Sequence, residues 1–478
     1  MKIIALGGSV RGSAHSKQFL MQSVLDSSDL DQYLDKMKQH VASGVPENRM
    51  LSNSEILSGV CLMGAKSERC DVDFYPLLEL FQRREKSIEA FDPNDYGLDE
   101  EIVHRDLLKL DQESLKIFLS KIEDADGIAF VSPVYFGDRS SVANKFIQLA
   151  GVKDLIKEKV VGAISVGTKR NGGQETTNIF FLYEALNLGA YVVGNGPESC
   201  QYGGTAWAGD KGKVLGDKFG IETSFGTGVR MSQFCRVTAN FPRVGFQHTP
   251  VEIAVIVTMD TPERRLRRFL QTYLESSCFD SSVPRFKLIE LIDGDIERCL
   301  ACNICPIPKY MEQTGNGQTP YACIIRRSED SMSLLRDEML SSDGIILAAL
   351  NLKDMSEVIY RYQAFMERTR FIRRNDFELT NVPISGFLLS EVGGYINPIH
   401  NLKVMTSFMR HNSVMTCPIT ATLHDGRVLD SGVKELRGFV QSTQKLKIAR
   451  EKTEAVTVSY KALGYGDKSL DHTFAVRK

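Results

Sequence analysis

The chain alternates short apolar segments with helical segments. The first apolar segment, MKIIALGG at residues 1–8, ends at a glycine pair. Further apolar segments lie at 126–132, 159–166 and 190–194, and helical patterns lie at about 15–25, 112–123 and 174–188. Apolar strands that alternate with helices predict βαβ units and a parallel sheet that is buried on both faces. Long polar segments at about 28–69 and 79–108 interrupt the pattern, and we expect them to lie outside the sheet.

The same pattern begins again after FPRVGFQHTP at 241–250, whose prolines and glycine are typical of a linker. The second series of apolar segments lies at 251–258, 286–292, 343–350, 382–389 and 413–419. Residues 124–146 align almost without gaps with residues 341–363, so that Asp126-Gly127 corresponds to Asp343-Gly344. We interpret this as a duplication, although any two α/β domains share part of such a pattern. The expected fold class is α/β, with two doubly wound parallel-sheet domains in tandem, at 1–245 and 250–478.

The C-terminal segment carries one more helical pattern. GVKELRGFVQSTQKLKIAR, at about 432–450, places Val433, Leu436, Phe439 and Val440 along one face. We expect this helix to pack outside the second sheet.

Composition excludes several classes of protein. The chain has 478 residues, which exceeds the roughly 250–300 residues that a single core reaches. Its net charge is −2, without a basic stripe, which argues against nucleic acid or an anionic membrane as a partner. No apolar segment approaches the roughly 18 residues of a membrane span, and the N-terminal apolar run is too short for a signal peptide. We therefore expect a cytoplasmic protein whose ten cysteines stay reduced.

Three loops of the first half are candidates for a ligand site. The first, LGGSVRGSAHS at 6–16, joins the first strand to a helix and offers the hydroxyls of Ser9, Ser13 and Ser16 with the cation of Arg11. Such a loop at a helix N-terminus favours a phosphate, although an ordinary Ser/Gly-rich turn has the same composition. The other two, SPVYFGD at 132–138 and SVGTKRNGGQE at 165–175, follow the next strands. Ligands of doubly wound sheets bind outside the carboxyl ends of the strands, where these loops meet.

The three loops resemble those of the NADPH-dependent FMN reductase family of flavodoxin-like proteins. Its hallmarks include G-S-x-R-x-x-S, P-V-Y-x-G and a Gly-rich loop that ends in Gly-Gly, and the resemblance runs from about Lys2 to about Val237. The resemblance implies an FMN whose phosphate lies on Ser9, Arg11, Ser13 and Ser16. It implies a flavin ring that lies against Pro133, Val134, Tyr135, Phe136, Gly137, Gly167, Asn171, Gly172, Gly173 and Gln174.

The second half carries a group of cysteines. RCLACNICPIPKY, at 298–310, contains Cys299, Cys302 and Cys305, and Cys323 follows further along. A C-x2-C-x2-C run with a more distant cysteine is typical of iron–sulfur clusters, whereas zinc prefers two C-x2-C pairs or mixtures with histidine. Zinc and a loop without metal remain alternatives at this point. Within the resembling family, iron–sulfur flavoproteins carry such a loop after the second strand, which implies a [4Fe-4S] cluster. The gap before Cys323 is longer than is usual there, so its place as fourth ligand stays open.

The second half lacks the flavin loops, because VTMDTPERR with Asp260 replaces the phosphate loop and ALNLKD replaces P-V-Y. We therefore expect an oxidoreductase in which FMN couples two-electron chemistry to one-electron transfer through the cluster. No side chain then needs to act as a nucleophile. The electron donor would be NAD(P)H or ferredoxin and the acceptor a small molecule or a protein, and a homo-oligomer stays open. The alternatives are an electron-transfer partner for a dedicated enzyme, or a flavin-only NAD(P)H quinone or nitro reductase with a structural zinc loop.

Overall fold

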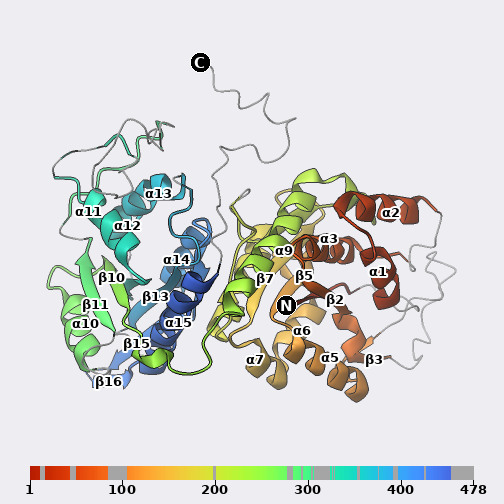
Figure 1. The fold of residues 1–478 in the computed structure, drawn as a ribbon, viewed down its shortest axis with the longest axis horizontal. Coiled ribbons are helices and arrows are strands. Elements are labelled where there is room, and N and C mark those ends of the chain that lie inside the picture. The colour runs from red at the N-terminus through yellow and green to blue at the C-terminus, as the bar shows by residue number, and fades with distance from the viewer. Residues whose placement is uncertain are drawn as a thin grey trace. The chain divides into compact units, whose positions relative to one another are not determined.

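The structure, a computed structural model, describes most of the chain. The described residues are 1–10, 17–43, 50–83, 105–197, 201–276, 284–291, 294–302, 305, 323–325, 327, 329–351, 356–374, 376–390, 397–424 and 427–453. They divide into two compact units (Figure 1). Unit 1 comprises Met1–Arg236, and unit 2 begins at Val237.

Unit 1 is built around a parallel β-sheet. The strands of the whole unit are β1 (Lys2–Gly7), β2 (Asp71–Pro76), β3 (Phe81–Arg83), β4 (Arg105–Leu110), β5 (Gly127–Tyr135), β6 (Asp138–Arg139), β7 (Val160–Gly167), β8 (Tyr191–Val192) and β9 (Gly204–Trp207). The order is β2-β1-β5-β7, and β7 then pairs with β8 at its start and with β9 at its end. This is the 2-1-3-4-5 order of flavodoxin-like doubly wound sheets.

Helices cover both faces of this sheet. They are α1 (Lys17–Leu25), α2 (Leu30–Ala42), α3 (Asn53–Ser67), α5 (Gln112–Asp124), α6 (Ser141–Ile147), α7 (Ala150–Ile156), α8 (Gln174–Asn187) and α9 (Lys218–Thr238). Phe130 of β5 stacks on Phe146 of α6 and on Phe181 of α8, which places these helices on one face. On the other, α3 and α9 cross closely, because a Cβ at Gly228 would lie 1.9 Å from the carbonyl oxygen of Cys61. Figure 1 shows α3 and α9 next to each other.

The described part of residues 28–69 contributes no strand to the sheet, as expected from the sequence, but α3 belongs to the core of the unit. This helix packs directly on β1, β2 and β5, and its residues from Ser54 to Ala65 are all buried. A helix that is buried on all sides shows no apolar stripe in its sequence, so the periodicity that marks surface helices is missing. The strand that follows it, β2, was not predicted either, because its sequence DVDFYP contains two aspartates.

The second polar segment, at about 79–108, has a different outcome. Its ends form β3 and β4, which pair with each other in a separate two-stranded antiparallel sheet. Residues 84–104 lie outside the described residues.

Unit 2 contains a second parallel sheet of the same order. Its strands are β10 (Glu252–Met259), β11 (Arg285–Glu290), β12 (Gly344–Leu350), β13 (Pro383–Ser390), β14 (Val414–Met415), β15 (Ile419–His424) and β16 (Arg427–Asp430). The order is β11-β10-β12-β13, and β13 pairs with β14 at its start and with β15 at its end. The antiparallel β16 extends β15.

The two units share a detail at the start of their sheets. The Asp126 carboxylate accepts a hydrogen bond from the backbone N–H of Lys2 (2.8 Å), and the Asp343 carboxylate accepts one from Glu252 (2.9 Å). The register is the same as well, since Ile3 pairs with Gly127 and Ile253 pairs with Gly344.

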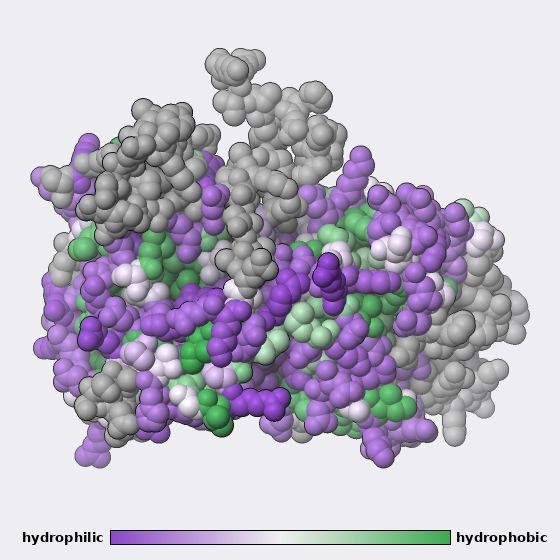
Figure 2. Space-filling view, viewed as in Figure 1, coloured by the Kyte–Doolittle hydropathy of each residue, from purple (hydrophilic) through white to green (hydrophobic). Residues whose placement is uncertain are grey.

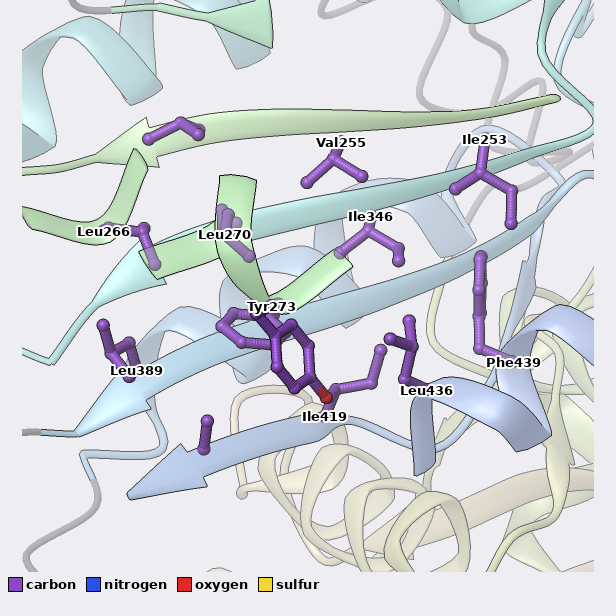
Figure 3. Packing of buried hydrophobic residues seen from close by; sticks show 14 of the residues in the cluster. Ile253, Val255, Leu266, Leu270, Tyr273, Ile346, Leu389, Ile419, Leu436 and Phe439 are labelled. Carbon is purple, nitrogen blue, oxygen red and sulfur yellow. The ribbon is translucent and has the colours of Figure 1, made fainter. Parts of the chain in front are cut away.

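One part of the core of unit 2 lies between its sheet and two helices, α10 (Arg265–Ser276) and α15 (Val433–Lys452). The other helices of the unit are α11 (Met332–Ser341), α12 (Ser356–Arg368), α13 (Arg370–Arg374) and α14 (Ile399–Met409). Figure 3 shows Leu266 and Leu270 of α10 and Leu436 and Phe439 of α15 packed over β10, β12, β13 and β15. The helix predicted at 432–450 is therefore confirmed, with Leu436, Phe439 and Val440 buried.

The surface is mainly polar. On the face drawn in Figure 2, hydrophilic residues predominate, and apolar residues form separate small areas among them. None of the described helices has the length and apolar character of a membrane span.

Two histidines are buried in unit 2. His400 Nε2 lies 2.8 Å from the carbonyl oxygen of Leu347, and His411 Nε2 lies 3.0 Å from Thr369 Oγ1. Burial lowers the pKa of His400 to about 4 and the pKa of His411 to about 3, from an ordinary value of 6.5. Each folded-state pKa lies below the unfolded value, so the unfolded chain binds more protons between these values. The free energy of unfolding must therefore fall as the pH is lowered from 6.5 towards 4.

We expect the loss of stability in unit 2 to reach about 1.4 kcal/mol per pH unit for each buried histidine. Hydrogen-exchange mass spectrometry of α14 at pH 7 and pH 5 measures the free energy of opening. His400→Gln should flatten its pH dependence, whereas the control His248→Gln, at an exposed position, should not. Equal pH dependence in the His400→Gln variant and the unchanged protein would show that His400 is not buried in its neutral form.

Candidate functional site

A pocket of about 350 Å³ opens at the carboxyl edge of the unit 1 sheet. Ser9 follows the end of β1, Pro133 lies near the end of β5, Gly167 ends β7 and Ala208 follows β9. The remaining lining residues are Ser52, Asn53, Ser54, Val134, Tyr135, Val166, Thr168, Gly209, Asp210 and Lys211. The volume lies within the roughly 300–1,000 Å³ that small-molecule sites occupy.

The pocket brings together part of the predicted flavin site. Of the residues predicted for it, the lining includes Ser9, Pro133, Val134, Tyr135 and Gly167. Arg11, Ser13 and Ser16 lie outside the described residues. Phe136, Gly137, Asn171, Gly172, Gly173 and Gln174 are not among the lining residues.

The side chain of Gln174 holds the Gly-rich loop after β7 in place through hydrogen bonds. Its side chain is 3% exposed, and its Oε1 accepts a hydrogen bond from the backbone N–H of Gly172 (2.8 Å). Its Nε2 donates to the carbonyl oxygens of Lys169 (2.6 Å) and Ala206 (3.0 Å). Buried backbone groups need such partners. Gln174 is thus a positioning residue that joins the loop after β7 to β9.

The tip of the 132–138 loop is a tight hairpin turn. Tyr135 pairs with Asp138, and the two residues between them have positive φ angles, +53° at Phe136 and +78° at Gly137. Both angles positive is the signature of a type I′ turn, which favours Asn-Gly and strains a bulky residue at the first position. The Phe136 side chain is nevertheless fully exposed, whereas Tyr135 lines the pocket. The two aromatic residues therefore do not flank one space in this conformation.

The N-terminus of α3 is the part of the pocket that the sequence analysis missed. Ser52 caps this helix, and Ser52 and Glu55 form a capping box in which each side chain binds the other residue's backbone N–H. Asn53 Nδ2 donates to the carbonyl oxygen of Asp210 (2.8 Å), which fixes the helix end to the loop after β9. The signal was present as the spacing S-x-x-E in SNSE, the pattern of a helix start. A helix start with free backbone N–H groups favours an anion.

A buried ion pair supports this helix end. Lys17 Nζ lies 2.8 Å from Glu55 Oε1, and both side chains are less than a tenth exposed. The pair joins the start of α1 to the start of α3. Removal of either partner would leave an uncompensated buried charge.

In unit 2, a carboxylate occupies the position that corresponds to the loop after β1. Asp260, which follows β10, is 2% exposed, and its side chain accepts hydrogen bonds from three backbone N–H groups. These belong to Thr261 (2.7 Å), Leu266 (2.9 Å) and Arg267 (2.9 Å), and the last two lie in the first turn of α10. The chain's own anion therefore takes the backbone donors at the start of this helix.

Four of the six cysteines of unit 2 line one small pocket. Cys299, Cys302, Cys305 and Cys323 surround a cavity of about 20 Å³. Cys302 is exposed and Cys323 is buried. The other lining residues are Leu300, Ala301, Ile324, Ile325, Arg368, Arg370, Phe371 and Arg374. Among the described residues, no group of three or more Cys, His, Asp and Glu side chains has a geometry that could hold a metal ion.

A buried ion pair anchors the segment that begins the cysteine loop. Arg368 Nη2 lies 2.6 Å from Asp330 Oδ2, and both side chains are almost inaccessible. Arg368 Nη1 donates to the carbonyl oxygen of Glu297 (2.8 Å), and the backbone N–H of Glu297 donates to Asp330 Oδ1 (3.2 Å). The chain just before Cys299 is thereby tied to α12. Close to the thiols, the backbone N–H of Ala301 donates to Cys299 Sγ (3.4 Å).

Part of unit 1 matches a known protein family. Residues 65–198 match the family model of NADPH-dependent FMN reductases. The chain is 33% identical over 127 residues to an iron–sulfur flavoprotein of Methanocaldococcus jannaschii, which covers 25% of this chain and 63% of that protein. It is 32% identical over 108 residues to an iron–sulfur flavoprotein of Methanosarcina thermophila, which covers 22% and 54%.

A third relative has a different name. The chain is 30% identical over 98 residues to an NAD(P)H dehydrogenase (quinone) of Acidovorax ebreus, which covers 20% of this chain and 49% of that protein. The matched segments thus span about half to less than two thirds of these relatives' lengths. Residues 65–198 therefore match the NADPH-dependent FMN reductase family, in agreement with the resemblance seen in the sequence.

Proposed function

We propose that the protein is an FMN-dependent NAD(P)H oxidoreductase that also transfers single electrons through a [4Fe-4S] cluster. The pocket of about 350 Å³ at the carboxyl edge of unit 1 is the observation that carries this proposal. It lies where doubly wound sheets bind their ligands, and it is built in part from the residues matched to the FMN reductase family.

The hydroxyl-rich end of the pocket suits the FMN phosphate. Ser9 lies there with the first residues of α3, and the N-terminus of that helix adds backbone donors and a favourable dipole. We assign the phosphate to Ser9 and to the segment Ser52–Ser54, together with Arg11, Ser13 and Ser16 of the preceding loop. In this arrangement α3, as well as the loop after β1, recognises the phosphate.

The rest of the pocket suits a planar ring. Pro133, Val134 and Tyr135 supply one side, and the backbone at Gly167 approaches from another. A Cβ at Gly173 would lie 2.8 Å from Gly137 Cα, so the two loops meet closely beside the pocket. Bound FMN would accept a hydride and release electrons one at a time. The chain would bind and orient it, with Gln174 holding the loop of Asn171, Gly172 and Gly173 in place.

Each chain should bind one FMN. In unit 2, the Asp260 carboxylate already takes three backbone donors at the start of α10. A phosphate there would meet a like charge and find its donors occupied. The second unit is therefore proposed as a degenerate copy of the first, with residues 1–245 as the FMN-binding domain and 250–478 as the domain with the cysteines. The shared strand order and the matching Asp126 and Asp343 hydrogen bonds support a duplication.

The donor set of the cysteine pocket suits an iron–sulfur cluster. Four thiols and three arginines line it, and no carboxylate or histidine does among the described residues. A cubane binds each thiolate to a different iron, so its ligands stand farther apart than the ligands of one zinc ion. The C-x2-C-x2-C spacing of three of these thiols, without a second C-x2-C pair or a histidine, fits the first case better.

A flavin-only quinone reductase is the second candidate function, because one relative is named NAD(P)H dehydrogenase (quinone). The two functions share the FMN pocket and differ at the cysteines. Iron content separates them.

The charge at residue 54 tests the phosphate site. Ser54→Asp should weaken FMN binding at least tenfold, roughly 1.4 kcal/mol, because a carboxylate would face the phosphate. Ser54→Asn is the matched control, because asparagine has nearly the same shape as aspartate and lacks its charge. Riboflavin, which lacks the phosphate, should bind both variants equally in a fluorescence titration. Equal FMN affinity of the two variants would place the phosphate elsewhere.

Substitution of Cys302 tests the cluster. Cys302→Ser should lower the iron content after anaerobic reconstitution, because an iron without its thiolate makes a cluster labile. It should leave FMN at one per chain, since the flavin loops belong to unit 1. Cys417→Ser, outside the cysteine pocket, should keep its iron. Unchanged iron and one-electron kinetics in Cys302→Ser would remove the cluster from the proposal and favour the flavin-only reductase.

A further inference from the structure

The cysteine pocket has an uneven charge. Three of its lining side chains are guanidinium groups, and its only other ionisable groups among the described residues are the four thiols. Arg368 is neutralised by its buried ion pair with Asp330. Arg370 and Arg374 of α13 supply the other two guanidinium groups beside the thiols.

Arg374 contacts a cysteine sulfur directly. Its Nη1 donates a hydrogen bond to Cys305 Sγ at 3.7 Å, and the residue is only 6% exposed. A guanidinium stays charged at any pH at which the protein is folded. The low exposure also means that water screens its charge poorly from the thiols.

We propose that Arg374 sets the reduction potential of the cluster held by Cys299, Cys302, Cys305 and Cys323; this inference rests on the proposed cluster. The potential of such a cluster depends on the charge around it, on hydrogen bonds to its sulfurs and on its exposure to solvent. Reduction adds one electron, so a fixed positive charge and an N–H donor at the sulfur of Cys305 stabilise the reduced state more than the oxidised state. Arg374 therefore raises the potential and makes the cluster easier to reduce.

This role differs from that of Arg368. Arg368 ties the chain before Cys299 to Asp330 and to the carbonyl oxygen of Glu297, so its removal should disturb the loop itself. Arg374 acts on a thiol that the loop already places. Its removal should change the energy of the reduced cluster more than the presence of the cluster.

The test is a redox titration of the reconstituted full-length protein, monitored by the EPR signal of the reduced cluster. Arg374→Gln should keep the iron content and shift the ratio of reduced to oxidised cluster at least tenfold towards the oxidised form, about 59 mV for a one-electron couple. Arg374→Lys keeps the charge and should shift it less. Arg327→Gln is the control, because Arg327 is exposed, pairs with Glu297 and does not line the pocket.

A second neutral variant, Arg374→Met, replaces Arg374→Gln if the glutamine amide prevents loading. A cluster that titrates at the same potential in a neutral variant and in the unchanged protein overturns this inference and leaves the proposed function standing. Absence of iron from the reconstituted, unchanged protein overturns both.

Discussion

The in-register parallel pairing of β1 with β5 and of β5 with β7 is the constraint on which the unit 1 site depends. Ile3 pairs with Gly127 and Gly127 pairs with Val160, so the three strands start level and end at one edge. The chain then leaves the sheet there as three loops, and Ser9, Pro133 and Gly167 meet around one pocket. Side chains supply partners for backbone groups at this edge. The buried Gln174 does so in the loop after β7, and Asn53 does so in the loop after β9.

Much of this arrangement could be predicted from the sequence, because buried parallel strands are continuous apolar runs. Segments such as KVVGAISV and DGIILAAL show them directly, and the loops after them follow from the topology. The role of α3 could not be predicted in the same way. Glycines such as Gly64 and Gly228 let α3 and α9 approach closely. Because α3 is buried on all sides, its sequence has no apolar stripe. An inserted pair of helices, α1 and α2, also separates α3 from the loop after β1 that the sequence analysis paired with α1.

The cysteine site shows a similar division. The C-x2-C-x2-C spacing indicates thiolate chemistry from sequence alone. The structure adds that Cys323, well beyond Cys305 in the sequence, lines the same pocket. The arginines around the thiols come from the segment ERTRFIRR, more than forty residues further along. Only the fold brings them to the cysteines, so sequence spacing contains no sign of them. The same holds for Asp260, whose three backbone partners depend on how the chain turns into α10.

The cofactor content of the anaerobically purified full-length protein tests the central claim most directly. Flavin released by denaturation and metals measured on the same sample give the number of each per chain. We expect one FMN, because Asp260 closes the second unit to phosphate, and four irons with sulfide and no zinc, because four cysteines with the spacing typical of a cluster line one pocket. Two flavins per chain, no flavin, or one zinc in place of iron would contradict the account.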